Sequence, residues 1–178
     1  MGLRRRAWRD VDERVFEATE GAVNDFVVRR LGVADVEIAL DTFRVMTDVF
    51  DEGGGPLSAE YVGTLLSRPD FWALAALEDG RPIGGITAHV IPMTRHEARE
   101  LFIYDLAVLA THQRRGVGRR LVETLGSSAA AAGISVAFVP ADVEDEHAIG
   151  FYHALGGDAA PVTIFTFEQP ATERRAAT

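Results

Sequence analysis

Cysteine and lysine are both absent from this chain of 178 residues, whose 18 lysine or arginine positions are all arginine. Without cysteine the chain forms no disulfide, no thiolate metal site and no cysteine nucleophile. Without lysine it has no Schiff base, no lysine base and no Walker-type phosphate loop. Long apolar runs are also missing, since no stretch approaches the ~20 apolar residues of a membrane span and none resembles a secretory signal. We therefore expect a soluble, cytoplasmic protein.

Positive charge is scarce as well. The 27 acidic residues outnumber the basic ones and leave a formal net charge of −9. A field of that sign opposes nucleic acid and anionic membranes and favours cationic partners, although acidity also simply keeps a protein soluble. The arginines at positions 4, 5, 6 and 9 precede this acidic domain, and we interpret them as part of a loosely attached end. We expect neither nucleic acid nor a membrane as a partner.

The order of apolar patterns predicts a single α/β domain. The length suits one domain, residues 25–169, between an N-terminal extension, 1–24, and a C-terminal tail, 170–178. Apolar runs predict strands at 26–31, 71–77, 82–93, 101–108, 134–140 and 162–167, and helical spacing predicts helices at 38–50, after Ser58, at 118–132 and at 145–155. Ser58 is placed to cap its helix, and residues 78–81 to form a hairpin turn. This order indicates an α/β sandwich on a central, largely antiparallel sheet.

A glycine- and arginine-rich loop lies between a predicted strand and a predicted helix. It consists of Gln113, Arg114, Arg115, Gly116, Val117, Gly118, Arg119 and Arg120. Its glycines allow close approach of a ligand to the backbone, and the unpaired amides at a helix start attract a phosphate. A Rossmann fingerprint would need a third glycine where Leu121 stands. The loop therefore predicts an anion cradle, with an exposed loop carrying solvated arginines as the alternative.

Two motifs in the C-terminal half resemble those of the GNAT acetyltransferases. Residues 113–118 match the Q/R-x-x-G-x-G/A signature between strand and helix, and residues 145–157 resemble the segment N-x-x-A-x-x-F-Y-x-x-L-G-F. The second motif departs from the family pattern in two places, where Asp145 replaces asparagine and Gly157 replaces phenylalanine. The resemblance implies a GNAT fold, with a mixed, mostly antiparallel sheet flanked by helices and a splay between two parallel central strands. It also suggests a homodimer.

The same resemblance implies that acetyl-coenzyme A is the co-substrate, with no metal. Backbone groups on the strand 101–108 would bind the pantetheine arm in the splay, and amides of the glycine loop would hold the pyrophosphate. The implied cofactor contacts are Leu106, Ala107, Val108, Gln113, Arg114, Arg115, Gly116, Val117, Gly118, Arg119, Arg120, Ala148 and Phe151. Tyr152 takes the family position of the acid that protonates or hydrogen-bonds the departing thiolate. Without the resemblance, a tyrosine after phenylalanine in a helix is a packed aromatic with a solvated hydroxyl.

Acetyl transfer to an amine also requires a proton acceptor, because alkyl amines are mostly protonated at neutral pH. The five histidines show no serine–histidine–acid arrangement, so direct attack in a ternary complex is favoured over an acyl-enzyme. Asp105 is the candidate base, since an acid within an apolar strand is costly unless it is paired or faces a cleft. Burial would raise its pKa toward a useful range. The alternative is a carboxylate satisfied by backbone amides or an arginine.

A narrower resemblance is to the type I gentamicin 3-N-acetyltransferases. Residues 103–108 match I-Y-D-L-A-V, residues 43–50 resemble F-R-V-M-x-D-V-F, and Ala141-Asp142 begins a similar acidic segment. The likeness runs from about residue 43 to 168, with divergent stretches at 52–58 and 93–97. It implies acetylation of the 3-amino group of an aminoglycoside antibiotic, a reaction that confers resistance.

Five residues are expected to bind this polycationic amine. They are Tyr104, Asp142, Glu144, Asp145 and Glu146. Carboxylates attract ammonium groups but also raise the pKa of the amine, so most must face the ammoniums that do not react. Acids at a helix start also complement the helix dipole, which is the alternative explanation.

Other functions agree with part of the pattern. A GNAT enzyme acting on another small amine, a polyamine or a protein N-terminus would keep both motifs. A coenzyme A-binding domain without turnover would need neither Asp105 nor Tyr152.

Overall fold

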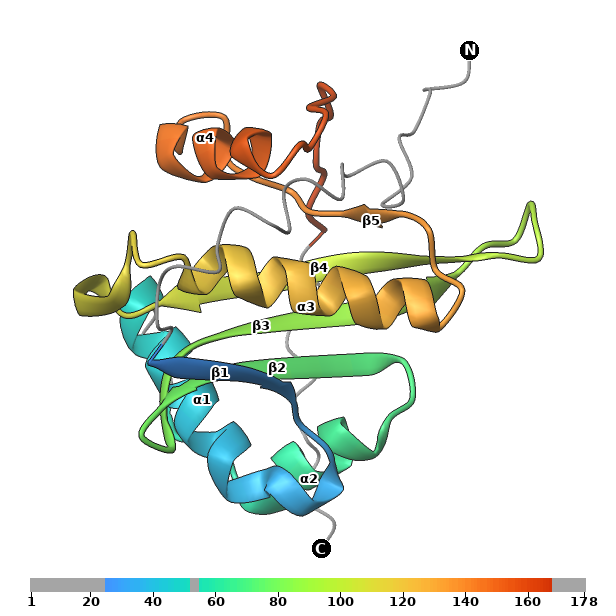
Figure 1. Cartoon of the computed structure of the whole chain (residues 1–178). Helices are drawn as coiled ribbons and strands as arrows, with labels where there is room; N and C mark the ends of the chain where they lie inside the picture. Colours follow the sequence, from blue (N-terminus) through green and yellow to red (C-terminus); the bar gives the residue numbers. More distant parts are fainter. Residues whose placement is uncertain (1–24, 52–54, 168–178) are drawn as a thin grey trace, which may run out of the picture.

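The computed structural model describes residues 25–51 and 55–167, and its core is a five-stranded sheet with helices on both faces (Figure 1). The predicted extension 1–24 and tail 170–178 lie outside the described residues, so the domain boundaries stay predictions. The elements are β1 (Phe26–Arg30), α1 (Val36–Phe50), α2 (Ala59–Ser67), β2 (Phe71–Glu78), β3 (Arg81–Pro92), β4 (Arg99–Val108), α3 (Val117–Ala131), β5 (Ala137–Phe138) and α4 (Glu146–Ala154). No helix within the described ranges has the length and apolar character needed to cross a membrane.

The sheet has the order β1-β2-β3-β4-β5, and its first four strands are antiparallel. β5 runs parallel to β4 and pairs only at Leu101–Ala137 and Phe102–Phe138. β4 continues to Val108, so its residues 103–108 have no paired strand on this side within the described part of the chain. The predicted α/β GNAT fold with a mixed, mostly antiparallel sheet is confirmed.

One predicted strand is wrong. Residues 162–167 form no strand, and the side chains of Val162, Ile164, Phe165 and Phe167 are between 70% and 83% exposed. A strand needs a backbone partner, and β5 has only two of the seven residues predicted for it, so it offers little edge to pair with. Alternating apolar residues show that a segment has strand propensity, but they do not show whether a neighbouring strand is available to pair with it.

Each face of the sheet has its own core. α3 packs on one face through Leu121, Leu125 and Ala129, which recur at helical spacing, and all three are fully buried. α1 and α2 cover the other face. Gly85 permits the close approach of α1, because a β-carbon there would lie 2.5 Å from Thr42 Cγ2 and 2.9 Å from Met46 Sδ.

Local signals at element ends are confirmed. The Ser58 side chain accepts a hydrogen bond from the Tyr61 amide, 3.1 Å away, and so caps α2. The β2–β3 turn places Asp79 and Gly80 at φ 50° and 76°, the left-handed pair typical of a tight hairpin. Gly133, at φ 75°, follows α3 in the left-handed conformation typical of a helix end.

Candidate active site

A β-bulge in β4 sets the position of Asp105. Thr87 pairs with Asp105 and Ala88 pairs with Ile103, so Tyr104 is the extra residue on β4. Thr87 lies two residues after Gly85 and therefore points to the same face of the sheet, the face that α1 covers. Thr87 Oγ1 donates a hydrogen bond to Asp105 Oδ2 at 3.3 Å. The partly buried carboxylate is thereby held on the α1 face, next to the exposed Tyr104.

Tyr104 belongs to a row of aromatic rings across three strands. Its ring lies 5.8 Å from the His89 ring and 5.8 Å from the Phe102 ring, each edge to face. The His89 ring in turn lies 5.3 Å from Phe71. Tyr104 itself is 62% exposed, so the row ends in an accessible aromatic surface beside Asp105. Such a surface can pack against the apolar faces of a ring-shaped substrate.

The glycine loop forms the N-terminal end of α3. Gly116 adopts φ 82° and caps the helix, and the first helical hydrogen bond runs from the Arg120 amide to the Gly116 carbonyl at 2.9 Å. The amides of Val117, Gly118 and Arg119 precede that bond and have no acceptor inside the helix. With the positive end of the helix dipole, they form a site suited to a phosphate.

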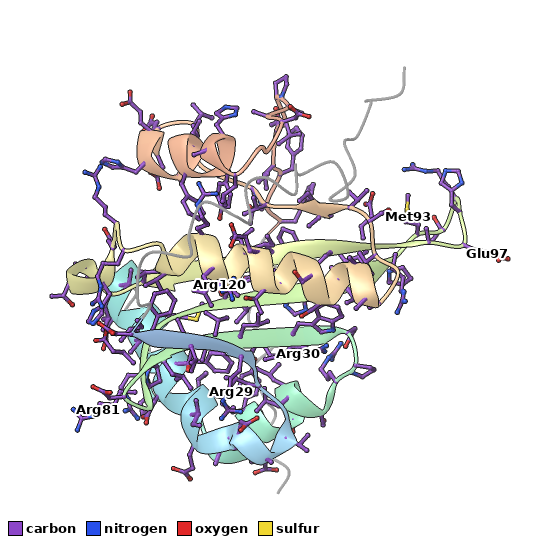
Figure 2. All side chains as sticks on the ribbon, viewed as in Figure 1. Arg29, Arg30, Arg81, Met93, Glu97 and Arg120 are labelled. Carbon is purple, nitrogen blue, oxygen red and sulfur yellow. The ribbon has the colours of Figure 1, made fainter. Side chains whose placement is uncertain are left out.

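Side chains of the loop mostly bind the protein itself. Gln113 Nε2 donates to the Val108 carbonyl at 3.2 Å, and Arg115 pairs with Glu78 at 2.6 Å. Arg119 donates to the Ala154 carbonyl at 3.2 Å. Arg120 lines a shallow pocket of about 330 Å³ with β1 and Thr124, and it lies on the β1 side of α3 (Figure 2). The side chains of Arg115 and Arg119 are therefore engaged by the protein, and the backbone amides of the loop are available as anion ligands.

α4 is seated on the first turn of α3. A β-carbon at Gly118 would lie 3.3 Å from Cζ of the Phe151 ring, so the ring packs directly over the α3 backbone. The hydrogen bond from Arg119 to the Ala154 carbonyl ties the end of α4 to the same turn. Ala148, in the first turn of α4, donates its amide to Asp145 Oδ1 at 2.9 Å. This packing holds α4, the helix that contains Tyr152, against the first turn of α3.

Tyr152 is a partly buried phenol on α4. Its ring meets that of Phe151 edge to face at 5.1 Å. Burial, followed by the negative charge of Asp145, raises the pKa of Tyr152 above its ordinary value of 10.0. A phenol with a raised pKa carries its proton throughout the neutral range, as a proton donor must.

The predicted acidic residues gather at the start of α4. Asp142, Glu144, Asp145 and Glu146 are all exposed. Asp142 Oδ1 accepts from the Glu144 amide at 2.9 Å, and Asp145 caps the helix. Two of the four acids thus have a local structural role, as the helix-dipole alternative expects. Each still has a second carboxylate oxygen that can face a cation.

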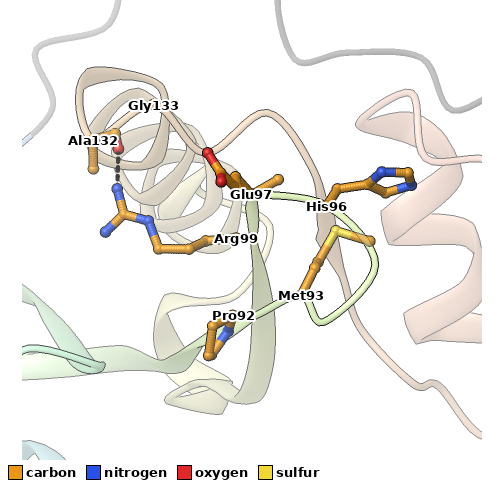
Figure 3. A pocket seen from close by; sticks show the side chains of 8 residues that line it. Pro92, Met93, His96, Glu97, Arg99, Ala132 and Gly133 are labelled. Carbon is orange, nitrogen blue, oxygen red and sulfur yellow. Dashed lines mark hydrogen bonds between the residues drawn. The ribbon is translucent and has the colours of Figure 1, made fainter.

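A pocket of about 420 Å³ lies elsewhere, at the opposite end of β4 from Val108 (Figure 3). It is formed by the β3–β4 hairpin and the C-terminal end of α3, where Arg99 donates to the Ala132 carbonyl at 2.7 Å. Met93 and Glu97 mark the tip of this hairpin (Figure 2). None of the residues predicted to act in catalysis or binding lines this pocket.

Three residues with a place in this site were not predicted. Thr87 bonds to Asp105, while Glu78 and His112 brace the glycine loop. Their roles depend on contacts between distant segments, which a local sequence pattern does not show. Of the three, only Glu78 belonged to a predicted feature, the turn at residues 78–81. Within residues 25–51 and 55–167, no cluster of three histidine, aspartate or glutamate side chains is arranged to hold a metal ion.

Comparison with known proteins agrees with this arrangement. Residues 38–156 match the Acetyltransferase (GNAT) family. The aminoglycoside acetyltransferase meta-AAC0020 from an uncultured soil metagenomic sample, solved with sisomicin, is 26% identical with a TM-score of 0.77; the match covers 83% of this chain and 97% of that one. The aminoglycoside acetyltransferase HMB0005, also from an uncultured soil metagenomic sample, is 33% identical with a TM-score of 0.73, over 83% and 99% of the two chains. No curated protein sequence matches the chain.

A third solved structure shares the fold at lower identity. The aminoglycoside N-acetyltransferase AAC(6')-Iy in complex with coenzyme A is 16% identical with a TM-score of 0.69, over 82% of this chain and 95% of that one.

Proposed function

This chain belongs to the GNAT acetyltransferase family, and we propose that it transfers the acetyl group of acetyl-coenzyme A to an amino group of an aminoglycoside antibiotic. The observation that carries this proposal is the seating of α4, the helix that contains Tyr152, on the first turn of α3, whose amides before the first helical hydrogen bond suit a phosphate. Relatives at 26% and 33% identity are aminoglycoside acetyltransferases, which supports the substrate class.

The residues present suit acetyl-coenzyme A as co-substrate. The amides of Val117, Gly118 and Arg119 would hold the pyrophosphate, because they precede the first helical hydrogen bond and have no acceptor inside the helix. The edge of β4 that faces away from β3 has no strand beside it from Ile103 to Val108 in the described chain. Backbone groups there, at Leu106 and Ala107, suit the amide groups of an extended pantetheine arm.

Two side chains would handle the protons. Acetyl-coenzyme A supplies the thioester whose carbon–sulfur bond breaks as the new carbon–nitrogen bond forms. Asp105 would accept the proton that the amine loses, directly or through a water molecule. Tyr152 would donate its phenolic hydrogen to the departing thiolate sulfur. No side chain becomes acetylated, so the transfer proceeds by direct attack in a ternary complex.

The acids at the start of α4 would bind ammonium groups that do not react. An excess of negative charge attracts a polycation, but a carboxylate beside an ammonium also raises its pKa and opposes deprotonation. Asp105 would then be the carboxylate that accepts the proton from the reacting nitrogen. From the resemblance of residues 103–108 to the gentamicin enzymes, we propose the 3-amino group as the acceptor and antibiotic resistance as the outcome. A homodimer and a cytoplasmic location remain predictions.

The test is an acetylation assay with the purified chain, acetyl-coenzyme A and an amine panel of gentamicin, kanamycin, spermidine and a peptide. Released coenzyme A can be followed with a thiol reagent, because a chain without cysteine adds no background. We expect turnover with gentamicin and, by NMR of the product, an acetyl group on the 3-amino nitrogen. Turnover with spermidine or the peptide, and none with the aminoglycosides, would show that the substrate is a polyamine or a protein N-terminus. Coenzyme A binding without turnover would indicate a binding domain.

A further inference from the structure

Glu78 links the β2–β3 hairpin to the glycine loop. Glu78 Oε1 accepts from Arg115 Nη2 at 2.6 Å, and Glu78 Oε2 pairs with His112 Nε2 at 3.0 Å. A carboxylate only accepts hydrogen bonds, so His112 carries a hydrogen on Nε2. His112 Nδ1 lies 2.8 Å from Thr111 Oγ1, which extends the network to a fourth residue. The carboxylate thus binds two side chains that are 34 and 37 residues away in the sequence.

The loop has a conformation that needs such support. Arg114 adopts φ 60°, a left-handed conformation that is unfavourable for a residue with a β-carbon, and Gly116 follows at φ 82°. Residues 113–116 form an exposed turn, so packing contributes little to their position. The amides that face a phosphate come directly after this turn, and any displacement of the turn would move them.

The other side of the network is anchored in the sheet, where Glu78 pairs with Phe26 of β1 and with Arg81 of β3. Glu78 is the last residue of β2, directly before the two left-handed residues of the tight turn. Its side chain is 25% exposed and that of His112 is 18% exposed, so both ends of the contact are partly shielded from water. The hydrogen bonds from His112 and then from Arg115 hold the pKa of Glu78 below its ordinary value, so the carboxylate is charged at neutral pH.

We propose that Glu78 is a positioning residue for the co-substrate: through Arg115 and His112 it holds the glycine loop in the conformation that presents the α3 amides to the pyrophosphate. This inference rests on the proposed function. It also assigns the Arg115 side chain to the loop's support rather than to the phosphate.

The test compares Glu78→Gln with Asp79→Asn. Glu78→Gln keeps the size of the side chain and removes its charge. Asp79→Asn removes the same charge one residue away, at a turn position that asparagine tolerates, and Asp79 makes no ion pair with the described part of the chain. For Glu78→Gln we expect the KM for acetyl-coenzyme A to rise about 3- to 10-fold with kcat nearly unchanged, as suits the loss of partly exposed charge-assisted hydrogen bonds. Glu78→Asp, which keeps the charge, should restore part of the affinity, and Asp79→Asn should match the wild type.

Limited proteolysis gives a second readout that does not depend on activity. Trypsin cleaves after arginine, and we expect cleavage after Arg114 and Arg115 to be about 3- to 10-fold faster in Glu78→Gln, because a loosened loop opens more often. If Glu78→Gln does not fold, Arg115→Gln breaks the same pair from the loop side and should show the same rise in KM. An unchanged KM and an unchanged cleavage rate would overturn the proposal, and so would a fall in kcat at constant KM. Failure of the wild type to bind coenzyme A would instead refute the proposed function, while the cleavage rates would still test the link.

Discussion

The ring of Phe151 lies against Gly118, so close that a β-carbon on this glycine would come within 3.3 Å of the ring. This contact joins α4, the helix that contains Tyr152, to the first turn of α3, the helix end that would hold the pyrophosphate. Glycine at position 118 therefore serves two purposes. It leaves room for the aromatic ring, and it exposes its own amide to a ligand.

Gly118→Ala should displace the Phe151 ring by a few tenths of an ångström and so impair catalysis. Gly150→Ala is the matched control, because it lies on α4 and a β-carbon there meets nothing within 4 Å. Both changes bring a similar gain in helix propensity, about 0.5–1 kcal/mol. We expect this gain to raise the free energy of unfolding only in Gly150→Ala, because the contact with Phe151 offsets it in Gly118→Ala. We expect Gly118→Ala to lower kcat/KM by about tenfold or more through misplacement of Tyr152, and Gly150→Ala to leave it unchanged. Steady-state kinetics and thermal unfolding measure the two effects, and equal activity of both variants would remove the proposed role of the contact.

Asp105→Asn tests the proton acceptor. Asparagine keeps the shape of the side chain and can still accept the hydrogen bond from Thr87, so the fold should be maintained. Loss of a general base typically lowers the rate by about 10²- to 10⁴-fold, and we expect a fall of that size in kcat. Asp142→Asn, which changes an exposed acid outside the sheet, should lower kcat far less. Near-normal turnover by Asp105→Asn would show that another group takes the proton.

Tyr152→Phe tests the proton donor, and we expect kcat to fall by about 100-fold with little change in stability at neutral pH. The raised pKa also has a consequence at high pH. A group whose folded pKa exceeds its unfolded pKa contributes stability that is complete below the unfolded value and is lost as the pH rises through the folded value. Wild-type protein should therefore lose more stability above about pH 10 than Tyr152→Phe does. Denaturant unfolding at pH 7 and pH 11 checks this, and identical losses in both proteins would mean that Tyr152 titrates normally.

Asp145→Asn separates the charge of Asp145 from its hydrogen bond. Asparagine caps a helix about as well as aspartate, so the stability should change little. Removal of the charge should lower the pKa of Tyr152 toward 10.0, because Asp145 is one of the two causes of its rise. The change in absorbance near 295 nm during alkaline titration, taken as a difference from Asp145→Asn/Tyr152→Phe, follows this tyrosine alone. An unchanged titration would leave burial as the whole cause.

The acids before α4 should act through long-range attraction. Neutralising the exposed Asp142, Glu144 and Glu146 together should raise the KM for a polycationic aminoglycoside without lowering kcat. The effect should shrink with added salt, because screening weakens interactions between exposed charges. Kinetics at low and high ionic strength measure it. An equal KM for the variant and the wild type at low salt would remove the proposed role of these three acids in substrate binding.

Local chemistry explains which parts of the molecule could be predicted. Ser58 and the turn at Asp79 and Gly80 each depend on neighbouring residues, and the structure confirms both. The helix predicted to begin at Gly118 begins one residue earlier, at Val117, with Gly116 as its N-cap. The bulge that pairs Thr87 with Asp105 and the pair between Glu78 and Arg115 depend on strand register and loop approach. Nothing in a local pattern reports such contacts. The strand predicted at 162–167 is wrong for the same reason, since pairing also depends on distant residues. The segment has strand propensity, but no neighbouring strand pairs with it.

The most direct test concerns the amides of Val117, Gly118 and Arg119. Their NMR signals in ¹⁵N-labelled protein can be followed during titration with coenzyme A and, separately, with pantetheine, which lacks the pyrophosphate. If these amides hold the pyrophosphate, their shifts should be among the largest with coenzyme A and small with pantetheine. Unchanged signals with coenzyme A, or equal shifts with both ligands, would contradict a diphosphate site at the start of α3.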